Sequence, residues 1–126
     1  MKLSKLDHLV LTVSDIEKTI SFYVSVMSMK KEVFGQGRVA LKYGNQKINL
    51  HEFGNEFEPK AKKPTPGSAD LCFITKTPLN EAMTQVTSCG VEIIEGPVER
   101  TGAKGPIRSF YFRDPDHNLI EVANEV

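Results

Sequence analysis

One pattern of apolar and polar residues occurs twice along the chain, and this internal repeat restricts the fold more than any other sequence feature. The segment Asp7–Leu11 aligns with Ala69–Phe73, and Ile48–Leu50 aligns with Ile120–Val122. The spacing of apolar residues predicts the order strand, helix and three strands in each copy. We therefore expect an α+β fold with two tandem βαβββ modules, whose equivalent positions converge on one place.

The first module is expected over about residues 4–53. Residues 6–13 are rich in apolar and β-branched side chains, which is typical of a strand. Ser14 and Glu17 have the spacing of a capping box, so we expect a helix from there to about Met27. Three more strands are expected at residues 30–34, 38–43 and 47–53, the last two joined by a turn at 44–46.

Residues 54–68 contain three prolines and few apolar side chains, so we expect an extended connector. The second module is expected over about residues 69–126. Thr77 and Pro78 predict a helix start, with the proline at the first helical position, and Gly90 predicts the helix end. Strands are expected at 69–75, 91–94, 107–112 and 118–123, with a polar loop over 95–105.

The composition excludes several classes of protein. A chain of 126 residues makes one domain, 1–126, and its 16 Lys and Arg balance its 16 Asp and Glu. Nucleic-acid binders usually carry a basic excess, so no nucleic-acid partner is expected. No apolar run reaches the ~18 residues of a membrane span, and no signal peptide is visible, so we expect a cytoplasmic protein with no membrane partner. Cys72 and Cys89 form no CxxC motif and are expected to be buried or half-buried free thiols.

His8 and Glu121 are the first candidate site residues. His8 lies in the middle of a predicted strand, and Glu121 lies between apolar neighbours, where an unpaired carboxylate would be costly. Imidazole nitrogen and carboxylate oxygen together suit a divalent metal: Ni, Zn, Mn, Fe or Mg. The alternative is a hydrogen bond between the two side chains on a solvated sheet face.

Three further residues are candidate metal ligands. Asn49 and His51 are two residues apart and share a strand face, so either can supply a third ligand. The alternative for His51 is a surface position near a strand end. Asp70 opens a predicted strand and is a candidate ligand, a candidate general base, or an ordinary strand-edge residue.

Tyr111 is a candidate catalytic residue, because its hydroxyl can donate a hydrogen bond to a substrate oxyanion; the alternative is a core tyrosine. Arg100, Lys104 and Arg108 form a loose basic cluster that suits an anionic substrate group or plain solvation. His117 lies in an Asp-Pro-Asp-His-Asn turn and is interpreted as a turn residue.

Several stretches resemble the vicinal oxygen chelate superfamily, which includes glyoxalase I, bleomycin resistance proteins, fosfomycin resistance enzymes and extradiol dioxygenases. These stretches are Leu6–Val13, the restart at Asp70 and above all Ser109–Glu121 (Ser-Phe-Tyr-Phe-Arg-Asp-Pro-Asp-His-Asn-Leu-Ile-Glu). Residues 59–75 and 100–106 resemble the glyoxalase domain-containing protein 5 group. The resemblance covers essentially the whole chain.

The resemblance implies an open, incomplete barrel of two modules, a divalent metal inside it, a small-molecule substrate and a homodimer. His8 and Glu121 match the family's ligand positions. Asn49 stands where glyoxalase I has Glu or Gln, and Asp70 stands where the second module usually has histidine. The implied function is a metal-dependent lyase or isomerase of the glyoxalase type, with Glu121, Asp70 and Tyr111 as catalytic residues. The alternatives are a non-catalytic small-molecule-binding protein and, less favoured, an extradiol dioxygenase.

Overall fold

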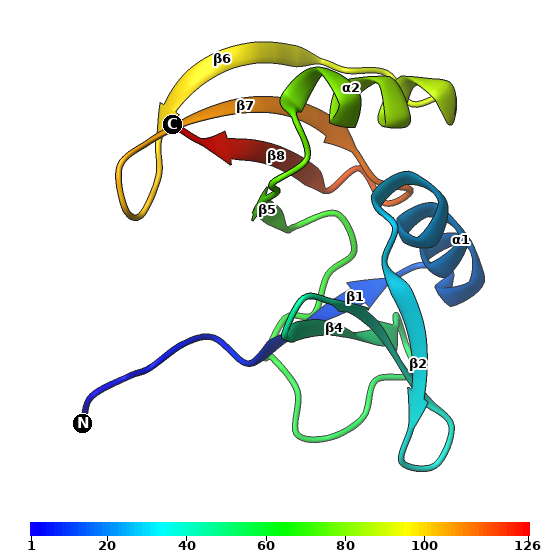
Figure 1. Ribbon diagram of the computed structural model, residues 1–126. Coiled ribbons are helices and arrows are strands. Elements are labelled where there is room, and N and C mark those ends of the chain that lie inside the picture. Colours follow the sequence, from blue (N-terminus) through cyan, green and yellow to red (C-terminus); the bar gives the residue numbers. More distant parts are fainter. The chain divides into compact units, whose positions relative to one another are not determined.

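The computed structural model describes every residue from Met1 to Val126. The chain divides into two compact units, Met1–Pro66 and Gly67–Val126. Each unit consists of one helix and one four-stranded sheet, and neither sheet closes into a barrel (Figure 1). The expected α+β class with two βαβββ modules is therefore confirmed. Neither helix has the length and apolar character needed to cross a membrane.

The elements follow the same order in both units. The first unit contains β1 (His8–Val13), α1 (Ile16–Met27), β2 (Lys30–Phe34), β3 (Arg38–Tyr43) and β4 (Gln46–Glu52), with the sheet order β1-β4-β3-β2. The second contains β5 (Asp70–Ile74), α2 (Leu79–Ser88), β6 (Glu95–Thr101), β7 (Pro106–Arg113) and β8 (Leu119–Glu125), with the order β5-β8-β7-β6. Residues 53–69 contain no helix or strand.

The strand registers of the two sheets coincide with the repeat in the sequence. In the first unit β1 runs parallel to β4, and Val10 is paired with Asn49. In the second unit β5 runs parallel to β8, and Cys72 is paired with Glu121. These two pairs occupy the same place in the aligned repeats. The alignment therefore describes a structural equivalence of the strands, residue by residue.

The core of the first unit lies between α1 and one face of its sheet. Ile20 and Tyr23 recur at helical spacing on α1 and are buried. Ile48 and Leu50 alternate with polar residues on β4 and are buried as well. Polar side chains of β1 and β4 consequently point to the opposite face of the sheet.

The core of the second unit is built in the same way. Phe110 and Phe112 on β7 are fully buried and stack with their ring centroids 5.8 Å apart. Ile120 on β8 is buried beside them, and α2 packs against β7 with Leu79 and Val86 buried (Figure 1). The other face of this sheet carries the polar side chains of β7 and β8.

Both helix starts differ from the expected ones by one residue. Asp15, not Ser14, is the N-cap of α1, and its carboxylate accepts a hydrogen bond from the backbone N–H of Lys18 at 3.0 Å. The predicted capping box is therefore wrong. In α2 the N-cap is Pro78 and no side chain caps the helix. The proline precedes the helix instead of occupying its first position.

The strand expected at residues 91–94 is wrong, and the expected polar loop that follows is mostly strand β6. Glu95 is paired with Tyr111 on β7, and the register shifts between Glu95 and Val98. The interruption coincides with Gly96, which has a φ of +120°. A Gly-Pro pair argues against a strand in sequence alone, but a bulge at a sheet edge accommodates it.

Candidate functional site

A row of polar side chains crosses the second sheet. Glu95, Tyr111, Glu121 and Cys72 occupy successive paired positions on β6, β7, β8 and β5. Side chains at paired positions point to the same face, and neighbouring strands lie ~4.8 Å apart. We call this set the polar row. It places two carboxylates, a phenol and a thiol on the face opposite the phenylalanine core.

Arg100 joins two members of the polar row. Its Nε donates to the Tyr111 hydroxyl at 3.0 Å, and its Nη2 donates to Glu95 Oε1 at 3.2 Å. The Tyr111 hydroxyl, the largest cause, and the Glu95 carboxylate raise the pKa of Arg100. A guanidinium only donates hydrogen bonds, so the Tyr111 oxygen accepts here and its own proton stays available. The Tyr111 hydroxyl can therefore donate a hydrogen bond to a group beside it on this sheet face.

Glu121 is half-buried in the middle of the row and interacts with the side chains on both sides. Burial raises the pKa of Tyr111, and the negative charge of Glu121 raises it as well, against the opposing effect of the hydrogen bond from Arg100. Burial and then the Glu121 carboxylate raise the pKa of Cys72 to about 11. The thiol is therefore protonated at neutral pH and is not a nucleophile as it stands.

By surface area both cysteines are exposed, which differs from the expectation of buried or half-buried thiols. Neighbouring atoms still shield the Cys72 sulfur from water in part, and this partial shielding is the burial that raises its pKa. Cys72 lies on the sheet face that α2 does not cover, and Cys89 is the C-cap residue at the end of α2. Asp70 is the exposed first residue of β5, on the same face as Cys72 two residues later. Its charge adds to the high pKa of that thiol.

His8 is the first residue of β1 and is open to solvent, with 42% of its side chain exposed. Its Nδ1 lies 2.8 Å from Asp7 Oδ2, and this hydrogen bond is the main reason why the pKa of Asp7 is lowered. A carboxylate that accepts from Nδ1 leaves the Nε2 lone pair available as a ligand. His8 therefore has the local geometry of a metal-binding histidine.

Asn49 and His51 share one face of β4, as expected, but both are buried, with 5% and 3% of their surface exposed. The surface alternative for His51 is therefore wrong. The Oδ1 atom of Asn49 has no hydrogen-bond partner. His51 Nε2 lies 3.4 Å from Arg38 Nη2, and its ring meets Phe57 edge-on with centroids 5.5 Å apart. An arginine side chain cannot accept a hydrogen bond, so His51 Nε2 is the acceptor here. The Nε2 lone pair that would bind a metal is therefore used in this hydrogen bond.

Burial lowers the pKa of His51, and the Arg38 charge lowers it further. The imidazole is consequently neutral at pH 7. Neither unit by itself gathers three histidine, cysteine, aspartate or glutamate side chains in a metal-binding cluster. The donor types of His8 and Glu121 nevertheless fit a divalent metal, since an imidazole with an oriented ring and a half-buried carboxylate are ordinary ligands for such an ion.

Of the three residues in the predicted basic cluster, Arg100, Lys104 and Arg108, only Arg100 contacts the polar row. Arg108 precedes Tyr111 by three residues on β7, so its side chain points to the other face. Lys104 lies in the turn between β6 and β7. His117 has a φ of +65° in the turn before β8, which confirms its interpretation as a turn residue.

Sequence reasoning missed Glu95 and Thr12 as polar groups of the two sheet faces. Glu95 was hidden in a stretch that looked like a loop, although Glu95, Val98 and Arg100 share one strand face once the bulge is known. Thr12 is buried opposite His51 on β1. The alternation of Thr12 with the apolar residues Leu11 and Val13 was the sequence signal that could have placed it on the polar face of β1.

Known proteins match the chain over its whole length. A family model described as the Glyoxalase/Bleomycin resistance protein/Dioxygenase superfamily matches residues 5–122. Virulence protein STM3117 of Salmonella typhimurium is 58% identical over all of this chain and 88% of its own length. The solved structure of integron cassette protein VCH_CASS1 from the mobile metagenome of V. cholerae is 63% identical, with a TM-score of 0.99 over 100% of this chain and 98% of that one.

A more distant solved structure shares the fold alone. It is a mutant of the genomically encoded fosfomycin resistance protein FosX from Listeria monocytogenes, complexed with Mn(II) and 1S,2S-dihydroxypropylphosphonic acid. It is 23% identical, with a TM-score of 0.66 over 97% of this chain and 90% of that one. The finer resemblance to the glyoxalase domain-containing protein 5 group stays a prediction. The extent of the family match shows that this chain belongs to the glyoxalase/bleomycin resistance protein/dioxygenase superfamily.

Proposed function

We propose that this protein is a metal-dependent enzyme of the glyoxalase type, a lyase or isomerase that acts on a small oxygenated substrate. The observation that carries the proposal is the polar row, in which Glu121 stands beside the phenol of Tyr111 and Arg100 fixes that phenol. A carboxylate next to an oriented hydrogen-bond donor is the combination that proton transfer beside a carbonyl requires.

His8 and Glu121 would hold the metal, with Asn49, Asp70 and His51 as further candidate ligands. The repeat supports this set, because His8 and Asp70 are equivalent in the two modules, as are Asn49 and Glu121. Asn49 contributes a buried oxygen without a partner. FosX shows that a protein of this fold carries Mn(II). A bound divalent ion would supply Lewis-acid polarisation of a substrate carbonyl.

The chain's own residues would do the rest of the chemistry. Asp70 or Glu121 would take the proton from the carbon beside the substrate carbonyl and return it to the neighbouring carbon. The Tyr111 hydroxyl would donate a hydrogen bond to the substrate oxygen as negative charge develops there. Arg100 acts through Tyr111 as a positioning residue, because its Nε donates a hydrogen bond to the phenol oxygen and so orients the hydroxyl.

The test is metal content, measured by mass spectrometry after reconstitution with Ni, Zn, Mn or Fe. We expect stoichiometric metal in the unchanged chain and a loss of most of it in His8→Ala and in Glu121→Gln. His117→Asn and Glu125→Gln are matched controls, because they change a turn histidine and an exposed carboxylate at the end of β8. Retention of metal and activity by a His8→Ala/Glu121→Gln double variant would overturn the proposal.

Activity is then screened with 2-oxoaldehydes and epoxides, and with catechols under oxygen uptake for the dioxygenase alternative. A non-catalytic ligand-binding protein is the second candidate, and a specific observation favours it. A cavity of about 260 Å³ lies on the first sheet with mostly apolar walls. Tight binding of a small molecule without turnover by metal-loaded protein would decide for this candidate.

The homodimer and the cytoplasmic location are part of the same proposal, and the homodimer rests on the family resemblance. Exposed apolar side chains such as Val33, Phe53 and Ile74 are compatible with an interface between copies. Light scattering on the purified chain tests the dimer, and a mass of about one chain at micromolar concentration would contradict it.

A further inference from the structure

The hydrogen bonds of Arg100 decide which charges the polar row can bind. A guanidinium has five N–H donors in a planar fork, and it binds carboxylate or phosphoryl oxygens with two neighbouring nitrogens at once. An arginine without acceptors from its own chain would therefore draw an anionic substrate group to the polar row. Whether Arg100 does so depends on the acceptors that its nitrogens already have.

All three nitrogens of the Arg100 guanidinium donate to acceptors of the chain. Nε donates to the Tyr111 hydroxyl at 3.0 Å, Nη2 to Glu95 Oε1 at 3.2 Å and Nη1 to the Glu99 carbonyl oxygen at 3.0 Å. The guanidinium carbon also lies 5.5 Å from the centroid of the Tyr111 ring. The Glu95 carboxylate thus occupies the place where an anionic ligand would otherwise bind the guanidinium.

The backbone of the bulge in β6 fixes the position of Glu95. Glu95 is paired with Tyr111 on β7, and the N–H of Ile94 donates to the Tyr111 carbonyl oxygen at 2.9 Å. The next residue, Gly96, has a φ of +120°, and an added Cβ there would lie 2.7 Å from Phe110 Cα. This conformation and this close approach both require glycine, so the bulge holds Glu95 beside β7 (Figure 1).

The ion pair between Glu95 and Arg100 is too exposed to contribute much to stability. The exposed fractions of the two side chains are 55% and 41%, and ion pairs of this kind are largely screened by water. The main effect of the pair is therefore on the charge of the site. The carboxylate neutralises the guanidinium, so no uncompensated positive charge lies next to the Tyr111 hydroxyl.

The other charges on this face act in the same direction. Glu121 lies in the middle of the polar row, and Asp70 is the exposed first residue of β5 on the same face. Arg113, at the end of β7, is also on this face, but its Nη1 donates to the His117 carbonyl oxygen at 3.3 Å. Carboxylates therefore outnumber guanidiniums around the polar row, and an anion is repelled there.

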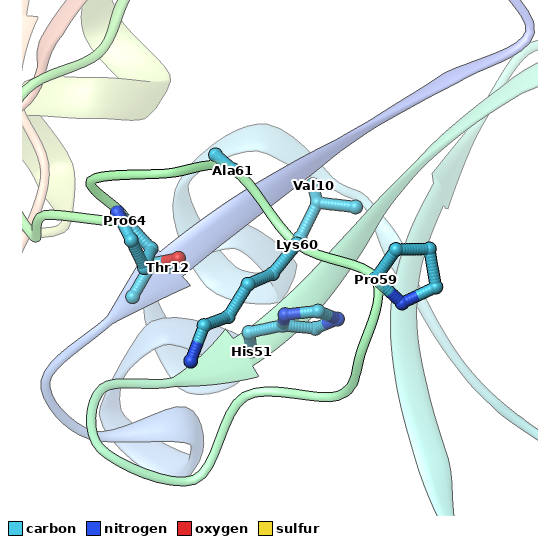
Figure 2. Close-up of a pocket in the computed structure, with 7 residues that line it drawn as sticks. All are labelled: Val10, Thr12, His51, Pro59, Lys60, Ala61 and Pro64. Carbon is cyan, nitrogen blue, oxygen red and sulfur yellow. The ribbon is translucent and has the colours of Figure 1, made fainter.

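The cavity on the first sheet has no such carboxylates. It is lined by residues of β1, β4 and the connector, and Lys60 is among them without any acidic side chain (Figure 2). The excess of carboxylates at the polar row is therefore a feature of the second sheet alone.

We propose that Glu95 is a specificity-determining residue, which occupies the anion-binding side of Arg100 and thereby selects substrates that carry no negative charge next to the oxygen that Tyr111 contacts. The inference rests on the proposed function in one respect, because it takes the polar row as the place where the substrate binds. It adds the class of substrate. Uncharged carbonyl compounds are accepted at the row, and carboxylates and phosphoryl compounds are rejected.

The probes are 2-oxopropanamide and 2-oxopropanoate, which have the same size and two adjacent carbonyl groups but differ in charge. Binding is followed by NMR on the full chain after treatment with a chelator, from the Arg100 Nε–H signal and the backbone amides of β6 and β7. The chelator treatment prevents a bound metal from contributing to the affinities. We expect the unchanged chain to bind the amide at least about tenfold more tightly than the carboxylate, which corresponds to about 1.4 kcal/mol.

Glu95→Gln removes the charge of this side chain and keeps its shape and one acceptor oxygen. It should raise the affinity for 2-oxopropanoate at least about tenfold and leave the affinity for 2-oxopropanamide within about twofold. Glu99→Gln is the matched control, because this exposed side chain belongs to the same strand but points to the other face, where Glu99 is paired with Arg108. In Glu95→Gln/Arg100→Gln the gain should be absent, because the guanidinium is the group that binds the anion.

Equal binding of the two probes by the unchanged chain would overturn the inference, as would an unchanged preference in Glu95→Gln or the absence of any response of β6 and β7 to both probes. The Arg100 Nε–H signal should persist in Glu95→Gln, since the Tyr111 hydroxyl still accepts from it. Disappearance of that signal would assign Glu95 a structural role and overturn a role through charge. The metal-dependent function fails by a different result, namely metal retained in the His8→Ala/Glu121→Gln double variant, which the charge preference of the metal-free chain does not affect.

Discussion

The two sheets have the same strand order and register, but the side chains around their equivalent central positions differ. On the second sheet Glu121 is paired with Tyr111 across β7, and the two side chains interact. On the first sheet the equivalent Asn49 is paired with Ala40 across β3, and its Oδ1 has no partner. The same backbone ladder thus supports a connected polar row in one unit and an isolated buried amide in the other.

The faces that carry these residues are also covered differently. In the first unit the connector lies over the sheet, and Thr12 and His51 are buried beneath it. In the second unit Glu95, Arg100 and Asp70 stay exposed. The repeat therefore determines the position of each side chain on its sheet. Whether that side chain is buried or exposed depends on whether another segment of the chain, such as the connector, covers the sheet face.

The largest expected effects test whether the two cores are equally important. Ile48 on β4 and Ile120 on β8 occupy equivalent positions and are both fully buried. Ile48→Ala and Ile120→Ala should each lower the free energy of unfolding by about 2–5 kcal/mol. Urea denaturation followed by circular dichroism measures both. A single shared transition would mean that the units unfold together, and a second transition in one variant would mean that they unfold separately.

The second prediction concerns the bulge that only the second sheet has. A Cβ at Gly96 would lie 2.7 Å from Phe110 Cα and from the Ser109 carbonyl oxygen, at a φ of +120°. Gly96→Ala should therefore cost about 3 kcal/mol of stability, from backbone strain and overlap together.

Gly37→Ala is the control for that variant, because Gly37 has a φ of +80° with nothing within 4 Å of its added Cβ. It should cost only about 1 kcal/mol, the conformational penalty alone. Thermal unfolding of both variants makes the comparison. Similar melting temperatures would contradict the overlap with β7 and with it the rigid placement of Glu95 beside Tyr111.

The elements that sequence analysis predicted well are those with a regular apolar period. Strand β1 and helix α1 show the apolar periods that the sequence suggested. The residues that the repeat aligned occupy equivalent places in the two sheets, where Asn49 is paired with Val10 and Glu121 is paired with Cys72. These features depend on local periodicity and on similarity within the chain, which are both visible in one sequence.

The parts that could not be predicted depend on contacts between distant residues. The sequence of β6 resembles a loop because the Gly96 bulge breaks the alternation of polar and apolar residues, and only the pairing with β7 makes it a strand. His51 is buried because the connector folds back over it, which no periodicity in 54–66 indicates. Tyr111 and Arg100 are eleven residues apart, and their hydrogen bond exists because β6 and β7 form a hairpin.

The third prediction concerns pH and separates the covered face from the exposed one. The pKa of His51 is lowered in the folded chain, first by burial and then by Arg38. The unfolded chain therefore binds this proton at higher pH, near 6.5, than the folded chain does. The stability that His51 contributes is fully present above about pH 6.5 and is lost as the pH falls towards the folded value.

His51→Gln removes the titrating ring, so its stability should fall less steeply than that of the unchanged chain between about pH 7 and pH 5. Denaturant midpoints at several pH values measure the slopes. His117→Asn is the control, since it removes an exposed histidine in a turn far along the chain from β4. Parallel curves for the unchanged chain and His51→Gln would contradict burial of a neutral imidazole under the connector.

The smallest expected effect is the most direct test of the difference between the sheets. Asn49→Leu replaces a buried amide without a partner for its oxygen by an apolar side chain of similar volume between Val10 and Ala40. Its stability should stay within about 1 kcal/mol of the unchanged chain or rise, because no hydrogen bond of that oxygen is lost. A loss of more than about 2 kcal/mol would show that the oxygen is satisfied in solution. Metal content of the same variant then tells whether the partner is the ion: retained metal would remove Asn49 from the candidate ligands, and lost metal would make Asn49 the functional equivalent of Glu121.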